Sequence, residues 1–174
     1  MLNILAISGS LRAASTNSAL IAALARNAPP GCRVTAYDGL GRLPIFNPDD
    51  EGERTPLDAS ALIDAVTRAD GVIVSCPEYA HGVPGGLKNA LDWLVSRDAA
   101  VAKPAMLAHA SLRSLFARAA EIMRTMSFAL CEEMPEIALL GKKPPEVEAI
   151  LAEPANRQAM HDAVSVFVEF IRSR

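Results

Sequence analysis

A short polar stretch near the amino terminus concentrates the side chains best suited to chemistry. Ser10, Arg12, Ser15, Thr16 and Asn17 supply three hydroxyls, a guanidinium and an amide within eight residues. Such groups can satisfy the three acceptor oxygens of a terminal phosphate monoester, which is close to a dianion. The stretch therefore predicts a phosphate site. The alternative, that Ser15 or Thr16 only caps a helix and Arg12 is solvated, stays open at this point.

The segments on either side place this stretch between a strand and a helix. A continuous apolar run from Leu2 to Ile7 is typical of a strand buried on both faces. Helical periodicity begins near Asn17, with Leu20 and Leu24 on the apolar face. A turn between them points backbone N–H groups outward at the positive end of the helix dipole, where anions bind. The turn lacks the spaced glycines of a dinucleotide fingerprint and the Gly-Lys pair of a Walker A loop.

Composition narrows the class of protein. The chain has 174 residues, 51% of them hydrophobic, and a net charge of -3. We expect one domain, residues 1–174, because this length supports a single core. The basic residues are scattered, which argues against a nucleic-acid partner, and no apolar run reaches the roughly 20 residues of a membrane span. Met1 leads directly into the first strand, so we expect a cytoplasmic protein. Three separated cysteines (Cys32, Cys76, Cys131) predict buried free thiols and no metal site.

Apolar strand patterns and amphipathic helix patterns alternate five times. The expected strands are 2–7, 32–37, 71–76, 104–110 and 128–131, the last continuing after a break to 137. The expected helices are 17–27, 57–66, 84–94, 115–126 and 160–171, and residues 142–145 read as a loop. This alternation predicts an α/β fold that is flavodoxin-like: a five-stranded parallel sheet of order 2-1-3-4-5 with helices on both faces. In that order, the loops after the first and third strands face each other across a crevice.

Two motifs carry a resemblance to a known family. The chain reads GSLRAASTN after its first strand and PEYAHGVPGGLKNALDW after its third. It thereby resembles the NAD(P)H-dependent FMN reductase family, which includes chromate reductases, quinone reductases and some azoreductases. The resemblance implies FMN as cofactor, NADPH or NADH as co-substrate and a ping-pong cycle that ends on a small-molecule electron acceptor. It also implies a homodimer or homotetramer. In this family, electrons pass directly from the nicotinamide ring to the isoalloxazine ring of FMN, so no catalytic side chain is expected.

The resemblance assigns roles to both loops. It implies that Ser10, Arg12, Ser15, Thr16 and Asn17 hold the FMN phosphate. The isoalloxazine ring would lie along the second loop, and the residues concerned are Pro77, Glu78, Tyr79, Ala80, His81 and Gly82, with Ser111 at the end of the fourth strand. Family members often carry Asn and Ser where this chain has Ala80 and Gly82. Two alternatives therefore stay open: an electron carrier of the flavodoxin kind, and a flavin-free binding protein on the same fold.

The sequence also predicts the surroundings of one tryptophan, one arginine and two histidines. Trp93 lies beside Asn89 and Asp92, off the apolar stripe of its helix, which predicts that it anchors a subunit interface. Arg97 would then reach a neighbouring site. His81 is either an exposed loop residue or a ligand of the substrate or partner subunit. His109 lies in an apolar strand and is expected to be a core or strand-end residue.

Overall fold

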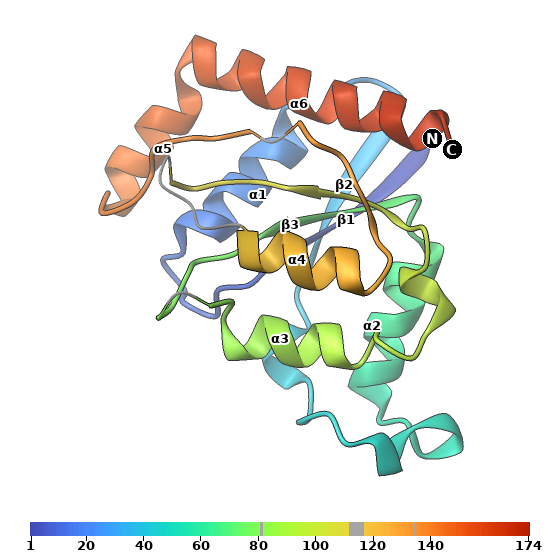
Figure 1. The fold of residues 1–174 in the computed structure, drawn as a ribbon. Helices are drawn as coiled ribbons and strands as arrows, with labels where there is room; N and C mark the ends of the chain where they lie inside the picture. Colours follow the sequence, from blue (N-terminus) through green and yellow to red (C-terminus); the bar gives the residue numbers. More distant parts are fainter. Residues whose placement is uncertain (81, 112–116, 134) are drawn as a thin grey trace.

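Five parallel strands form one sheet in the order β2-β1-β3-β4-β5, which confirms the expected fold class (Figure 1). The computed structural model describes residues 1–80, 82–111, 117–133 and 135–174. The strands are β1 (Leu2–Ser8), β2 (Cys32–Tyr37), β3 (Gly71–Ser75), β4 (Pro104–Leu107) and β5 (Ala129–Leu130). β1 and β3 are neighbours, with Ile4 opposite Gly71 and Ser8 opposite Ser75, so their carboxyl ends lie side by side.

Helices cover both faces of the sheet, as Figure 1 shows. One layer contains α1 (Thr16–Arg26), α5 (Pro144–Ala152) and α6 (Pro154–Arg172). The other contains α2 (Leu57–Arg68), α3 (Gly85–Asp92) and α4 (Ala117–Thr125). Alternate side chains of the central strands supply the two cores: Ile4 and Ile73 face the first layer, and Leu5 and Val74 face the second. This two-sided burial explains the continuous apolar runs of β1 and β3.

Helix α5 corrects the expectation of a loop at residues 142–145. It begins at Pro144, with prolines in its first turn, where a missing N–H leaves no hydrogen bond unmade. Val147 and Leu151 are buried on its inner face. Residues 142–145, expected to be a loop, therefore include the start of a helix.

The long connection between β2 and α2 packs on α3. The indole Nε1 of Trp93 donates to the backbone oxygen of Pro44 at 2.9 Å. The Phe46 ring meets Trp93 edge-on, with ring centroids 5.0 Å apart. Trp93 has 0% of its surface exposed. The prediction that it anchors a subunit interface is therefore wrong, because the chain's own connection covers it.

The end of α3 is tied to the same connection. Arg97 Nη2 lies 3.5 Å from a carboxylate oxygen of Glu51 and 3.4 Å from Thr55 Oγ1. Ser96 also donates a hydrogen bond to Glu51. Arg97 thus holds the connection of its own chain, which differs from its expected reach toward a neighbouring site.

The pairing of β4 continues beyond its last strand residue, although β4 and β5 are both shorter than expected. His109 N–H donates to the Pro135 carbonyl at 2.8 Å, and Ile137 N–H donates to the His109 carbonyl at 2.9 Å. Leu139 N–H then donates to the Ala110 carbonyl at 3.2 Å. The expected continuation from β5 to residue 137 is confirmed. It carries the chain back to the carboxyl edge of the sheet.

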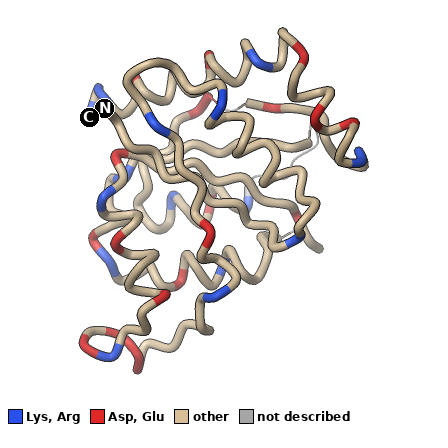
Figure 2. Tube along the Cα trace, turned by 180° about the vertical axis from the view of Figure 1, so that it is seen from behind, with Lys and Arg blue, Asp and Glu red and all other residues tan. Residues whose placement is uncertain are grey.

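Charged residues of both signs are spread along the whole trace (Figure 2), and acidic residues gather in the segment 49–53 of the projecting connection. In the described parts of the chain, no helix has the length and apolar character needed to cross a membrane.

Candidate functional site

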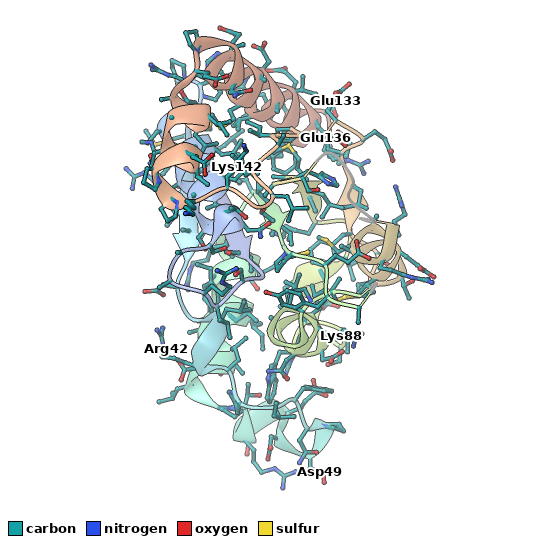
Figure 3. The ribbon with its side chains drawn as sticks, turned by 90° about the vertical axis from the view of Figure 1, so that its left-hand side faces the viewer. Arg42, Asp49, Lys88, Glu133, Glu136 and Lys142 are labelled. Carbon is teal, nitrogen blue, oxygen red and sulfur yellow. The ribbon has the colours of Figure 1, made fainter. Side chains whose placement is uncertain are left out.

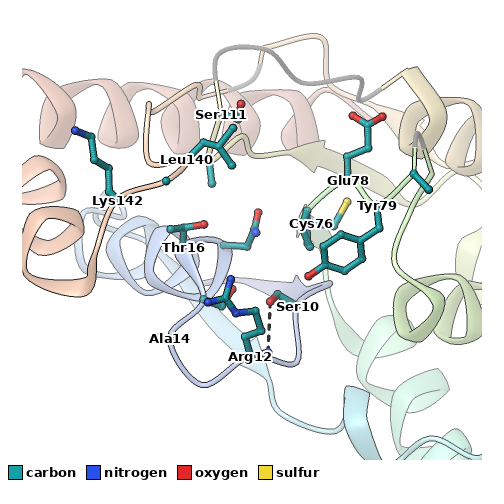
Figure 4. A pocket seen from close by; sticks show the side chains of 16 residues that line it. Ser10, Arg12, Ala14, Thr16, Cys76, Glu78, Tyr79, Ser111, Leu140 and Lys142 are labelled. Carbon is teal, nitrogen blue, oxygen red and sulfur yellow. Dashed lines mark hydrogen bonds between the residues drawn. The ribbon is translucent and has the colours of Figure 1, made fainter.

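A cavity of about 650 Å³ opens at the carboxyl edge of the sheet and brings the two motif loops together (Figure 4). This is the topological switch point, where the strand order reverses and where ligands bind in doubly wound folds. Figure 4 shows Glu78 and Tyr79 on one side, Thr16 and Lys142 on the opposite side, and Ser10 and Arg12 along the lower rim. The lining consists of Ser10, Arg12, Ala14, Ser15, Thr16, Asn17, Cys76, Pro77, Glu78, Tyr79, Ala80, Ala110, Ser111, Leu140, Gly141 and Lys142.

The first loop is fixed by close contact with the end of β3. Gly9 N–H donates to the Ser75 carbonyl at 2.8 Å. A Cβ on Gly9 would lie 2.5 Å from the Cβ of Cys76, so only glycine fits this crossing. The hydroxyls of Ser8 and Ser18 lie 2.9 Å apart and join the two ends of the loop. The loop is therefore held in shape before any ligand arrives.

Two side chains of this loop, Ser15 and Asn17, already make hydrogen bonds within the protein. Ser15 caps α1, and its Oγ accepts the N–H of Ser18 at 3.2 Å. Ser15 therefore caps the helix, and it keeps its hydroxyl proton as a donor to a ligand. The Ser75 hydroxyl donates to Asn17 Oδ1 at 3.0 Å, and Asn17 is buried. This hydrogen bond orients the Asn17 amide, whose two N–H donors can serve a ligand.

The second loop makes a tight turn at the cavity wall. Tyr79 and Gly82 exchange backbone hydrogen bonds of 3.0 and 2.9 Å. Ala80 has a φ of 49°, a left-handed conformation that an alanine seldom adopts. Gly82 closes the turn and is not among the residues that line the cavity. His81 lies outside the described residues.

Burial controls the ionisation of two groups near the site. It raises the pKa of the Cys76 thiol to about 12, with Glu78 adding to the effect, so the thiol stays protonated at neutral pH. Burial also lowers the pKa of His109 to about 4, and this ring is 2% exposed. The expectations of a buried Cys76 thiol and a strand-end core histidine are confirmed. Cys131 is also buried and free, whereas Cys32 is free but only half-buried.

Sequence reasoning missed the part of the cavity that follows β5. Leu140, Gly141 and Lys142 line it, together with Cys76 and Ala110. Gly141 has a φ of 78° in the turn that presents its neighbours. These residues lie about 30 positions beyond Ser111 in the sequence, and only the pairing of residues 135–139 with β4 brings them back. A glycine next to two lysines and two prolines was the one available signal.

The residues present fit the FMN that the resemblance implies. The volume lies within the roughly 300–1,000 Å³ of small-molecule sites. One end offers the guanidinium of Arg12, hydroxyls and the donors of Asn17, which suit a phosphate. The other end offers the backbone of residues 77–80 and the half-exposed ring of Tyr79, which suit a flat polar ring system.

Comparison with known proteins supports the same interpretation of the cavity. Residues 2–138 match the family described as NADPH-dependent FMN reductase. The chain is 38% identical over 94 residues to a quinone reductase of Escherichia coli (strain K12), which covers 53% of this chain and 50% of the relative. It is 40% identical over 92 residues to a 2-hydroxy-1,4-benzoquinone reductase of Burkholderia sp, which covers 53% of this chain and 49% of the relative. The chain thus matches about half the length of these relatives.

A solved structure extends the likeness to the whole fold. The flavoenzyme NAD(P)H:(acceptor) oxidoreductase FerB of Paracoccus denitrificans superimposes with a TM-score of 0.81 at 23% identity, covering 99% of this chain and 98% of the other. At this identity the likeness concerns the fold alone. The family match, by contrast, includes both motif loops and all five strands. The chain therefore belongs to the NADPH-dependent FMN reductase family.

Proposed function

We propose that this protein is an FMN-dependent oxidoreductase that passes electrons from NADPH or NADH to a small-molecule acceptor. The observation that carries the proposal is the convergence of both motif loops on one cavity of about 650 Å³. When bound, FMN supplies the electron-transfer chemistry. The contribution of the chain is to hold the cofactor, to orient its ring and to leave one face open. A nicotinamide and an acceptor use that open face in turn, which gives ping-pong kinetics.

The phosphate end provides affinity and selectivity. Arg12 supplies the positive charge, Ser10 and Thr16 supply hydroxyls, and the N–H groups at the start of α1 add the helix dipole. Asn17 donates from a fixed position because Ser75 holds its oxygen. A phosphate bound here replaces water on groups that are already oriented, so little ordering is needed on binding.

The ring end provides orientation. The backbone from Pro77 to Ala80 lines the cavity, and Ser111 faces it from the end of β4. Tyr79 is 54% exposed at the rim, where its ring can contact the flavin or a planar second substrate. Quinones head the proposed acceptors because two of the relatives are named as quinone reductases. Free flavins, azo compounds and metal oxyanions are the other classes.

We also propose a homodimer or homotetramer. Its support is the family resemblance, since the side chain expected to anchor an interface, Trp93, is buried within the chain. Light scattering at micromolar concentration measures the mass directly, and a monomer would refute this part of the proposal.

The decisive experiment titrates apoprotein with FMN and riboflavin and then mixes the loaded protein with NADPH or NADH. We expect Arg12→Ala to weaken FMN binding by about 2 kcal/mol, roughly thirtyfold, and riboflavin binding much less. Arg33→Ala is the matched control, because Arg33 is exposed on β2 and does not line the cavity.

Each alternative has its own outcome. Bleaching of the flavin band by a nicotinamide supports the oxidoreductase. A flavin that dithionite reduces and neither nicotinamide does would indicate an electron carrier. Equal affinity of the wild type for FMN and riboflavin would show that the first loop is no phosphate site, and absence of any flavin binding would indicate a flavin-free protein.

A further inference from the structure

Lys142 lies where two cavities meet beside the first loop. The larger cavity and a neighbouring one of about 230 Å³ share four lining residues, Ala14, Ser15, Thr16 and Lys142. Three of these belong to the loop assigned above to a phosphate. Figure 3 shows Lys142 beside the start of α5, far from the acidic tip that Asp49 marks.

The backbone holds Lys142 in this place while its side chain stays adjustable. Leu139, fully buried, donates its N–H to the Ala110 carbonyl, and Lys142 N–H closes the next turn on the Leu139 carbonyl at 3.1 Å. The Lys142 side chain is 45% exposed, and its ammonium lies 3.7 Å from a carboxylate oxygen of Glu146. In Figure 4 the end of this side chain points away from Arg12. The backbone of Lys142 is therefore fixed, whereas its ammonium group can move.

The charges around the cavity favour an anion near Lys142. Among the described lining residues, Arg12 and Lys142 are cationic and Glu78 is anionic, and Figure 4 places Glu78 on the side opposite Lys142. A phosphate monoester carries about −1.5 to −2 at neutral pH, so a single guanidinium leaves part of its charge unbalanced. Without an anion in the cavity, the exposed carboxylate of Glu146 is the better partner for the lysine.

We propose that Lys142 is a second phosphate-binding cation of this site, one that leaves Glu146 and turns into the cavity when a phosphate monoester is bound. The inference rests on the proposed function and extends it with a residue outside both motif loops. Release from Glu146 is easy, because a half-exposed ion pair at 3.7 Å contributes little to stability. Glu146 stays in place without the lysine, since its other oxygen accepts the N–H of Lys143 at 3.0 Å.

The test measures dissociation constants of FMN and riboflavin by quenching of flavin fluorescence in titrations with apoprotein. We expect Lys142→Gln to weaken FMN binding about tenfold and riboflavin binding less than about twofold, because only FMN carries the charge. Lys142→Arg keeps the charge and should retain FMN affinity within about threefold. Lys143→Gln is the matched control: it removes the same charge one residue away, from an exposed side chain that lines neither cavity.

Three results would overturn the inference. FMN affinity unchanged in Lys142→Gln, with a KM raised for NADPH and not for NADH, would assign the cation to the extra phosphate of that coenzyme. Equal weakening of FMN and riboflavin would make Lys142 a packing residue. Equal weakening of FMN binding by Lys142→Gln and Lys143→Gln would show that only the net charge of the protein matters. Wild-type protein that binds neither flavin would remove the proposed function itself, an outcome distinct from the other three.

Discussion

Asn89 is the residue whose removal should most directly loosen the long connection over α3. Its Oδ1 accepts the N–H of Phe46 at 2.8 Å, and its Nδ2 donates to the Pro44 carbonyl at 2.9 Å. Pro44 keeps a second donor in the Trp93 indole. Asn89→Ala therefore deletes two hydrogen bonds and leaves one half-buried donor, the N–H of Phe46, without its partner.

The magnitude follows from these contacts. Two hydrogen bonds contribute about 1 kcal/mol each, and an N–H left unpaired adds about 1 kcal/mol. Alanine recovers roughly 0.6 kcal/mol as the better helix former at this position in α3. The free energy of unfolding should thus fall by about 2 kcal/mol, which in a chain of this size lowers the melting temperature by roughly 4–8 °C.

Urea denaturation followed by tryptophan fluorescence is the appropriate assay, because Trp93 is the single tryptophan and lies beneath this connection. The midpoint should fall while the slope with denaturant stays constant. Asn3→Ala is the control, since the Asn3 side chain is exposed, and it should change stability by less than about 0.5 kcal/mol. A loss of less than about 0.5 kcal/mol in Asn89→Ala would refute the assignment of Asn89 as the clamp of this connection.

Two further predictions concern a buried histidine and a strained turn. His109 has its pKa lowered to about 4, so below pH 6.5 the unfolded chain takes up a proton that the folded chain refuses. Between pH 7 and pH 5 the wild type should therefore lose about 2 kcal/mol more unfolding free energy than His109→Gln, and parallel pH curves in urea denaturation would contradict this. Ala80→Asn should relieve the left-handed backbone at φ 49° and raise the unfolding free energy by about 0.5–1 kcal/mol, since asparagine tolerates this conformation. Ala80→Val, which tolerates it least, should lower the unfolding free energy in the same urea denaturation, and the reverse order would exclude strain at this turn.

The sheet and the meeting of the two motif loops could be predicted because their signals are local. Each central strand is a continuous apolar run, and each motif loop directly follows one of them. Parallel pairing then places both loops at the same edge of the sheet. Nothing beyond the pattern of buried strands was needed to bring Arg12 and Tyr79 to one cavity.

The surroundings of Trp93 and Lys142 could not be predicted because they come from segments distant in the sequence. The periodicity of α3 describes only its own faces, and the connection that buries Trp93 lies more than 40 residues earlier. Lys142 reaches the cavity through backbone pairing with residues 109 and 110, which leaves no trace in side-chain pattern. Contacts of this kind depend on packing between elements, and a pattern within one element cannot encode them.

The turn at residues 79–82 is the reason we expect the site to bind a flavin despite Ala80 and Gly82. The turn is closed by backbone bonds between Tyr79 and Gly82, and its cavity wall consists of backbone as well as side chains. The structure therefore requires a left-handed backbone at position 80, whereas a Cβ at position 82 would make only an ordinary contact with the Tyr79 carbonyl oxygen at 3.6 Å. Asparagine adopts this conformation with less strain than alanine. We therefore expect this turn to hold a flavin edge through its backbone groups, without the side chains of asparagine and serine.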